Sequence, residues 1–397
     1  MLDLSKLARQ MQGISDHLTK EAEASRRRVE VAQQLLHQAS LQQSQLVEQL
    51  NQHRDRLLFT AAEPIEPLDT RIAIEAAPAA HTVLSSDGSQ ISPSHHEIAY
   101  CYLLNISRVV IHYGQSRYPI LDSLPEVIYR PEDLYASRKW GIRTEEWMGY
   151  KRTASEAVML GELAQTCTKT DAKTGNIPTL AMTDGSLIYW FLEQIPAAAR
   201  DEILNPVLES WERSRLASVP VMGYISASRS GEALNFLRLQ SCPFEQPNCM
   251  AHCEDRRDET PCNSFAPLRD VTLWSTSLAP GDRGPIWKSS ADILSCYGEH
   301  AVYFCYVHVG AEIARVEFPQ WVVADSKLLN SALSLMLAQV QKGFGYPVAL
   351  AEAHNQAVVR GGDRTRFFTL LEQQMIRAGL KNVGTSFKEA RKRGSIA

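Results

Sequence analysis

Apolar residues recur every three or four positions over the first 60 residues, which is the spacing of a helix. The first run is Leu4, Leu7, Met11, Ile14 and Leu18, and the second run is Val29, Ala32, Leu36, Leu46, Leu50 and Leu57. Two successive steps of four separate the runs, a stutter that locally relaxes a coiled coil. Only Gly13 interrupts the helix formers before Pro64. We therefore expect one long N-terminal helix or coiled coil over residues 1–60, which either packs on its own subunit or dimerises.

Beyond residue 80 one sequence motif occurs twice, an apolar run that ends in Asp-Gly-Ser. The first copy occupies residues 87–89 and the second occupies residues 184–186. The residues before each Asp favour a strand, and the Gly allows a sharp turn after it. Taken alone, each copy is more often an ordinary turn, because Asp-Gly is a common turn dipeptide. If the two strands lie side by side, however, Asp87 and Asp184 point at one place, where a hard divalent cation would find oxygen ligands.

The remaining pattern alternates strands with helices. We expect strands at residues 98–106 and 108–114, an irregular segment at 123–142, a helix at 144–167, an amphipathic helix with Trp190, Phe191 and Leu192, a helix at 203–214, and a strand at 219–226. Further along, we expect paired strands at 301–309 and 312–319, followed by helices at 327–341, around residue 354, and at 364–379. Strands and helices mixed in this way predict an α/β fold.

Composition narrows the class of protein without naming an activity. Of 397 residues, 44% are hydrophobic and 22% are charged, as in soluble globular proteins. The net charge of −4 excludes a uniformly basic nucleic-acid sheath, so contacts with DNA would come from local patches or a metal. No apolar stretch approaches the length of a membrane span, and the polar N-terminus is unlike a signal peptide. A cytoplasmic location is the default expectation.

Half of the eight cysteines lie within residues 242–262. Cys242, Cys249, Cys253 and Cys262 have the spacing C-x6-C-x3-C-x8-C. Thiolates at such density can bind Zn²⁺ or an iron-sulfur cluster. The spacing lacks the C-x2-C pairs typical of zinc sites, so free thiols in a surface insertion, or a disulfide, are the alternatives.

In order along the chain, the motifs resemble those of the NurA family of DNA-repair nucleases. They are the first Asp-Gly-Ser, Arg-Thr-Ala-Ser-Glu at 152–156, the second Asp-Gly-Ser, Gly-Tyr-Ile-Ser at 223–226, Arg-Val-Glu-Phe-Pro at 315–319, and Gly-Tyr-Pro-Val-Ala-Leu-Ala-Glu-Ala-His at 345–354. The resemblance extends from about residue 80 to about residue 370. It implies an RNase H-like (Piwi-like) mixed sheet flanked by helices and a toroidal homodimer. It also implies a nuclease that depends on Mn²⁺ or Mg²⁺.

The resemblance also implies which residues bind the metal. Asp87 matches the first metal-binding carboxylate of the family and Asp184 the second. A third carboxylate comes from the helix between them, where Glu156 follows Arg152 in the RxxxE arrangement, with Glu162 as the fallback. The competing interpretation is that Glu156 is a solvated helix residue.

Two further residue types complete the implied site. Tyr346 matches the tyrosine of the Gly-Tyr-Pro motif, and His354 matches the histidine eight residues later. His354 could complete the metal shell or donate a proton, and Tyr346 could orient a phosphate or water. Arg360, Arg364 and Arg366 are candidates for DNA phosphate contacts. Without the motif, these residues read as a packed turn tyrosine, a surface histidine and a charged helix face.

These expectations give a helical segment at 1–60, a nuclease domain at 80–380 with a Cys-rich insertion at 242–262, and a basic tail at 381–397. By resemblance, the protein would act as a 5′-to-3′ exonuclease and single-strand endonuclease in double-strand break end resection. Its partner would be a hexameric HerA-type ATPase. The alternative is a non-catalytic adaptor that assembles with such an ATPase and regulates it.

Overall fold

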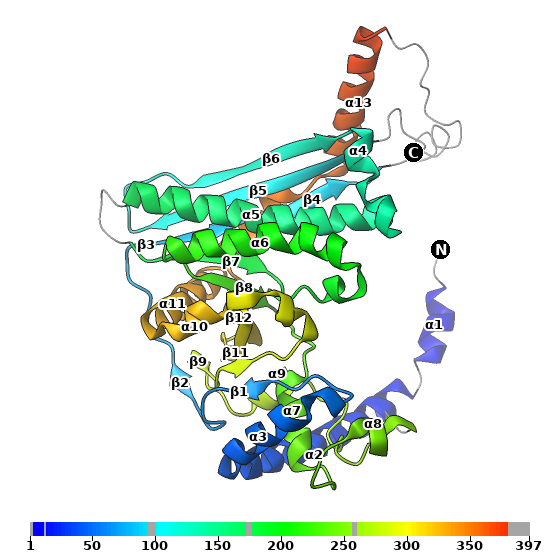
Figure 1. Cartoon of the computed structure of the whole chain (residues 1–397), viewed down its shortest axis with the longest axis vertical. Coiled ribbons are helices and arrows are strands. Elements are labelled where there is room, and N and C mark those ends of the chain that lie inside the picture. The colour runs from blue at the N-terminus through cyan, green and yellow to red at the C-terminus, as the bar shows by residue number, and fades with distance from the viewer. Residues whose placement is uncertain (1–2, 12, 94–100, 172–176, 256–259, 380–397) are drawn as a thin grey trace. The chain divides into compact units, whose positions relative to one another are not determined.

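A computed structural model describes residues 3–11, 13–93, 101–171, 177–255 and 260–379 (Figure 1). The chain divides into two compact units. Unit 1 contains Met1–Ile74, Ile225–Leu294 and Ala301–Glu317, and unit 2 contains Glu75–Tyr224, Ser295–His300 and Phe318–Ala397. The N-terminal helical segment therefore shares a unit with the middle of the chain, a division that differs from a single nuclease domain over 80–380. The basic tail expected at 381–397 lies outside the described residues.

The long N-terminal helix is present in unit 1, but it is interrupted. It consists of α1 (Leu4–Gln10), α2 (Ile14–Leu41) and α3 (Gln43–His53). Gly13 takes a positive φ of 90° at the first break, and Gln42 leaves helical geometry at the second. The expected long N-terminal helix is confirmed, with breaks at these two positions.

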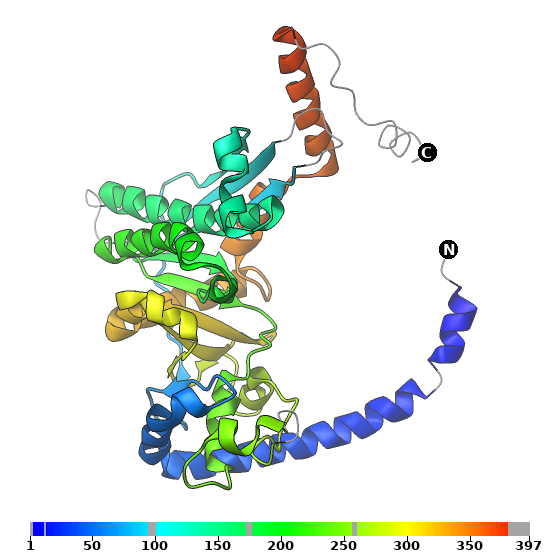
Figure 2. The ribbon, with the colours of Figure 1, turned by 45° about the vertical axis from the view of Figure 1, so that its right-hand side comes forward.

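The second apolar run of this segment packs on the core of unit 1. Leu36, Leu46 and Leu50 join a cluster that includes Phe236 and Trp274. These partners lie on α7 (Glu232–Gln240) and α9 (Asp270–Ser275). The first run remains exposed instead, and the N-terminal half of α2 extends away from the rest of unit 1 (Figure 2).

The strands of unit 1 are short except for two. They are β1 (Glu63–Pro64), β2 (Ile72–Ala73), β9 (Asp282–Arg283), β10 (Trp287–Lys288), β11 (Val302–His308) and β12 (Ile313–Pro319), in the order β1-β10-β11-β12, with β9 pairing both β11 and β2. The expected pairing of the segments at 301–309 and 312–319 is confirmed.

The four clustered cysteines also belong to unit 1, around the short helix α8 (Cys249–His252). Among the described residues none of the four forms a disulfide, and three of them are buried. Within the ranges that the structure describes, no three Cys, His, Asp or Glu side chains are grouped so that they could hold a metal ion. Hydrogen bonds hold this segment instead: Arg238 donates to Cys262 Sγ at 3.7 Å, and Ser241 donates to the Cys262 carbonyl at 3.0 Å. The expected zinc or iron-sulfur site thus gains no support.

Unit 2 is built on a mixed sheet, as the predicted α/β class requires. Its strands are β3 (His81–Ser85), β4 (Gly88–Ile91), β5 (Tyr102–Tyr113), β6 (Ile120–Ile128), β7 (Thr179–Asp184) and β8 (Val221–Ile225), in the order β8-β7-β3-β5-β4, with β6 also pairing β5. Strands β8, β7 and β3 run parallel, whereas β4 and β6 pair antiparallel with β5.

Two local expectations for this sheet are wrong. The segments at 98–106 and 108–114 belong, over their described residues, to one strand, β5, which passes through Ser107 without a break. Part of the segment expected to be irregular, 123–142, is strand β6, which pairs with β5 alone and places Pro125 opposite Asn105. Proline removes one backbone donor, and a strand at the edge of a sheet tolerates that loss.

Helices cover both faces of the unit 2 sheet. Helices α5 (Thr144–Asp171) and α6 (Ala197–Leu216) lie side by side on one face (Figure 1), and α12 (Val348–Ala357) lies on the other (Figure 2). The expected amphipathic helix with Trp190 is only a short 3-10 helix, η3 (Trp190–Gln194).

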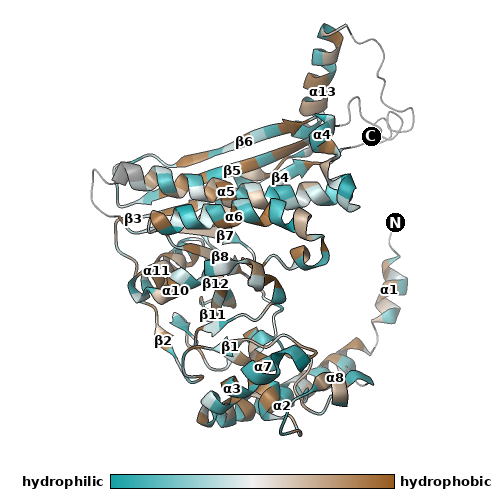
Figure 3. Cartoon of the chain, in the orientation of Figure 1, coloured by the Kyte–Doolittle hydropathy of each residue, from teal (hydrophilic) through white to brown (hydrophobic). Residues whose placement is uncertain are grey.

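The remaining helices of unit 2 are α4 (Pro131–Leu134), α10 (Gln320–Ala324), α11 (Ser326–Lys342) and α13 (Gly361–Arg377). Hydrophobic and hydrophilic residues both occur along α13 (Figure 3), and Phe368 packs on Ile91 and Leu103 of the sheet. Over the described ranges, no helix combines the length and the apolar character needed to cross a membrane.

Candidate active site

The two Asp-Gly-Ser motifs lie at the ends of neighbouring parallel strands. Strand β3 pairs with β7 so that Ser85 lies opposite Met182. Asp87 and Asp184 each follow these partners by two residues, so both carboxylates lie at the carboxyl ends of adjacent strands, where open α/β sheets bind ligands. The expected convergence of the two strands is confirmed.

The glycines of the two motifs have different structural roles. Gly185 has φ +107°, so it supplies the sharp turn after Asp184 that was expected of both copies. Gly88 instead permits close approach of α5. A β-carbon at residue 88 would lie 2.5 Å from Glu156 Oε1 and 2.6 Å from Arg152 Cγ. Glycine at this position therefore lets the glutamate of α5 reach the strand ends.

Asp87 is fixed through its backbone and its side chain. The Asp87 N–H donates to Ser107 Oγ at 2.9 Å, which ties the turn to β5. One carboxylate oxygen accepts the Gly88 N–H at 2.7 Å, and the other lies 3.1 Å from His354 Nδ1. The sheet and α12 thus present Asp87 and His354 to each other.

Glu156 is the helix carboxylate that faces the aspartates. Its side chain is 16% exposed and lies 3.2 Å from Arg152 Nε. Burial raises the pKa of Glu156 to about 8; the Arg152 guanidinium opposes this shift, and the negative charges of Asp87 and Asp184 add to it. Glu162, the fallback for the third carboxylate, is exposed to solvent. The structure therefore places Glu156, and not Glu162, at the strand ends.

Asp184 is paired with Tyr346. Burial raises the pKa of Asp184, as does the charge of Asp87, whereas a hydrogen bond from Tyr346 lowers it. Tyr346 packs edge-on against Tyr224 with ring centroids 5.8 Å apart. The tyrosine ring is therefore held from β8 while its hydroxyl reaches the carboxylate.

Helix α12 is held at both ends, which sets the position of His354. At its start, the Ala349 N–H donates to the buried Gln339 side chain at 3.0 Å. At its end, Asn105 donates to the Ala357 carbonyl at 2.8 Å, and Ser89 donates to the same oxygen. The His354 side chain is nevertheless 70% exposed, so it remains open to a ligand. Sequence patterns did not single out Gln339 and Asn105, because each is a polar side chain within an apolar run, and they gave Ser89 no role beyond its place in the Asp-Gly-Ser motif.

The three candidate DNA-binding arginines lie at the start of α13. Arg360, Arg364 and Arg366 are all exposed. Arg366 lies 3.9 Å from Asp363, and Arg364 lies over the ring of Phe368 at 5.4 Å. Their exposure leaves them accessible to a phosphate backbone.

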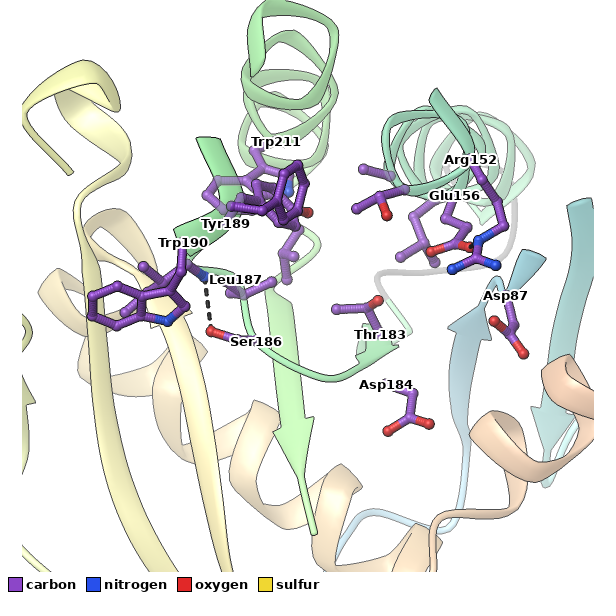
Figure 4. Close-up of a pocket in the computed structure, with 16 residues that line it drawn as sticks. Asp87, Arg152, Glu156, Thr183, Asp184, Ser186, Leu187, Tyr189, Trp190 and Trp211 are labelled. Carbon is purple, nitrogen blue, oxygen red and sulfur yellow. Dashed lines mark hydrogen bonds and ion pairs between the residues drawn. The ribbon is translucent and has the colours of Figure 1, made fainter. Parts of the chain in front are cut away.

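A pocket of about 520 Å³ adjoins the carboxylates (Figure 4). Asp87, Glu156 and Asp184 form one side, and Arg152 of α5 lies beside them. The other side is formed by apolar and aromatic side chains of α5, α6 and the segment after β7. They are Ala157, Leu160, Leu187, Ile188, Tyr189, Trp190, Phe191 and Trp211. Local sequence patterns do not predict this aromatic wall, because its residues come from separate segments of the chain.

A family model described as the NurA domain matches residues 81–359, which is well over half of the chain. The chain belongs to the NurA family. All five residue types that the family resemblance implied, at Asp87, Glu156, Asp184, Tyr346 and His354, are brought together in unit 2 of this NurA protein.

The chain is similar to solved NurA structures at low sequence identity. The NurA nuclease from Sulfolobus solfataricus is 12% identical, with 95% of this chain and 98% of that chain covered and a TM-score of 0.51. A NurA structure with manganese is 11% identical, covering 85% and 97% with a TM-score of 0.40. A third, bound to dAMP and manganese, is 10% identical, covering 90% and 96% with a TM-score of 0.35. A comparison with curated proteins gave no match.

The carboxylates of this NurA protein suit a hard cation in their chemistry. Oxygen ligands are those that Mg²⁺ and Mn²⁺ take in proteins. In the described ranges, no three acidic, histidine or cysteine side chains are already grouped to hold an ion, and Glu156 and Asp87 are engaged with Arg152 and His354 instead. Burial and mutual repulsion raise the pKa of Glu156, a cost that a cation would offset. Metal binding would therefore require these two side chains to exchange partners.

We expect Glu156→Gln to stabilise the metal-free protein increasingly as pH rises. The pKa of Glu156 is about 8 in the folded protein, against 4.5 for the unperturbed side chain. Folding therefore takes up a proton between pH 4.5 and about pH 8. Above pH 8 the buried, charged carboxylate therefore lowers the free energy of unfolding. Glutamine carries no charge, so it should raise the free energy of unfolding there by about 1 to 3 kcal/mol. Urea unfolding with chelator from pH 6 to 9 measures the difference. Glu162→Gln is the matched control, and an unchanged pH profile in Glu156→Gln would contradict the burial argument.

Proposed function

We propose that this NurA family member is a metal-dependent DNA nuclease. The observation that carries the proposal is the convergence of Asp87, Glu156 and Asp184 from two parallel strands and a helix. His354 and Tyr346 each contact one of these carboxylates. Three converging carboxylates beside a pocket, with burial raising the pKa of Glu156 and of Asp184, are what phosphodiester hydrolysis by a bound cation requires.

Each residue of the candidate site is assigned a role from its position. Asp87, Glu156 and Asp184, with His354, would hold Mn²⁺ or Mg²⁺. When bound, the ion supplies charge neutralisation at the scissile phosphate and an acidified water. Tyr346 donates a hydrogen bond to Asp184, so it orients that carboxylate. Arg152 is a cation within reach of a phosphate once Glu156 no longer engages it.

The family resemblance supports a proposal for the finer activity. We propose that the substrate is DNA, cut as a 5′-to-3′ exonuclease and as an endonuclease on single strands, during end resection in the cytoplasm. The partner would be a HerA-type ATPase, and the RNase H-like nuclease would act as a homodimer. The exposed apolar residues at the start of α2 and in α1 are available for such an assembly, as a coiled coil.

A cleavage assay tests the function directly. Labelled single-stranded and double-stranded DNA, with an RNA strand of the same sequence, is incubated with Mn²⁺, Mg²⁺ or chelator. We expect cleavage of DNA that requires the metal and is faster on single strands. Absence of cleavage under all conditions, together with stable binding to an ATPase, would favour the alternative of a non-catalytic adaptor.

A further inference from the structure

The pocket beside the carboxylates has two chemically different sides. Arg152 and the acidic residues lie on one side, and aromatic side chains of the segment after β7 lie on the other (Figure 4). Because Asp184 ends β7, the turn that carries the metal candidate leads directly into Tyr189, Trp190 and Phe191. The segment that follows β7 therefore links one carboxylate, Asp184, to the aromatic side of the pocket.

The volume and lining suit one nucleotide unit. Pockets for small ligands typically measure about 300 to 1,000 Å³, with an apolar lining and a few polar groups, and this pocket measures about 520 Å³. Thr153 and Thr183 add hydroxyl groups to its lining. Such a mixture offers stacking surface and hydrogen-bonding groups in one small space.

One aromatic residue of the lining is not explained by core packing. Trp190 is 40% exposed, whereas its neighbours Tyr189 and Leu192 are buried. Phe191 already stacks on Tyr150, with ring centroids 4.5 Å apart and planes 10° from parallel. An exposed indole next to a preformed aromatic stack favours a planar ligand, because every nucleobase has a π-face that such rings can cover.

We propose that this pocket receives one unpaired nucleobase of the strand being cut, stacked against Trp190, while Arg152 binds a neighbouring phosphate. The inference rests on the proposed nuclease function and deepens it. The salt bridge from Arg152 to Glu156 keeps the guanidinium at the carboxylate side of the pocket in the metal-free protein. Release of Glu156 to a metal would leave Arg152 available to an anion at the same place.

Entry of an unpaired base into the pocket also determines which DNA is a good substrate. A base that enters the pocket must leave its partner strand, which opposes binding of a duplex more than binding of a single strand. Paired DNA away from ends or mismatches is therefore a poor substrate. The preference would arise from the aromatic wall and not from the carboxylates.

An abasic scan combined with Trp190→Ala tests the pocket. The substrates are single-stranded oligonucleotides in which one abasic residue is moved stepwise past a fixed cleavage site. With the unaltered protein, we expect one position at which the abasic residue lowers kcat/KM about tenfold, as loss of one stacked base would. Trp190→Ala should lower kcat/KM on the intact strand by a similar factor and lose the sensitivity to the abasic residue, whereas Trp190→Phe should keep it.

Tyr118→Ala is the matched control, because Tyr118 is 95% exposed and lies outside the pocket. It should behave as the unaltered protein does. Equal cleavage of every abasic oligonucleotide by the unaltered protein would overturn the pocket and leave the nuclease function standing. If the unaltered protein does not cleave, the nuclease function fails. Binding of the same oligonucleotides with Ca²⁺ then decides the pocket: a position-specific loss that Trp190→Ala abolishes supports it, and uniform affinity overturns it.

Discussion

Asp184→Asn is expected to reduce metal-dependent DNA cleavage by about a thousandfold or more. Asparagine keeps the size of the side chain but removes the negative charge at the end of β7. Loss of one ligand charge from a site that neutralises a phosphate costs several kcal/mol in the transition state, and about 4 kcal/mol corresponds to a thousandfold. Asp87→Asn should act in the same way, because the two residues occupy equivalent ends of adjacent strands.

The same variants should still fold. Burial and the charge of Asp87 raise the pKa of Asp184, so removing its charge relieves a repulsion in the metal-free protein. Melting temperature and Mn²⁺ titration are measured beside cleavage, and we expect weakened metal binding with an unchanged or raised melting temperature. Glu162→Gln is the matched control, since Glu162 is exposed on the same helix as Glu156. Full activity in Asp184→Asn would remove this carboxylate from the catalytic site.

Local patterns located the strand ends because a strand and its turn are encoded within a few residues. The apolar runs before Asp87 and Asp184 and the glycines after them were enough to predict both exits. The choice between Glu156 and Glu162 needed a contact distant in sequence. In the structure, α5 approaches Gly88 so that Glu156 reaches the strand ends, whereas Glu162 stays exposed.

Other features were not predicted, because buried polar residues interrupt the apolar pattern from which strands and helices are predicted. Ser107 divides two apolar runs, which predicts two strands, yet it is buried and binds the backbone at Asp87. Strand β6 lacks apolar alternation because it is an exposed edge strand that carries Pro125. The division into two units depends on contacts between residues 1–74 and 225–317, which no local pattern records.

The second large effect concerns stability and lies in unit 1. Arg315 is buried, donates to Glu317 at 2.7 Å and to Ser230 at 2.9 Å, and lies 2.9 Å from Glu232. Its guanidinium also lies over the ring of Phe304 at 3.6 Å. Both glutamates are themselves buried, and each forms an ion pair with this arginine.

Arg315→Met is therefore expected to lower the free energy of unfolding by about 3 to 5 kcal/mol, the usual cost of leaving buried charges unpaired. Urea unfolding measures it. Arg108→Met is the matched control, because Arg108 pairs with Asp122 where both are partly exposed, and such pairs contribute about 0 to 1 kcal/mol.

A triple variant separates the pair from the packing. Replacing Arg315, Glu317 and Glu232 together by methionine removes all three charges, so much of the loss should return, since buried ionic groups are often replaceable by apolar ones. Equal losses in Arg315→Met and Arg108→Met would contradict the argument. Because Arg315 belongs to unit 1 and the candidate active site to unit 2, the folded fraction of Arg315→Met should keep its cleavage rate, whereas Asp184→Asn should lose activity and keep its stability.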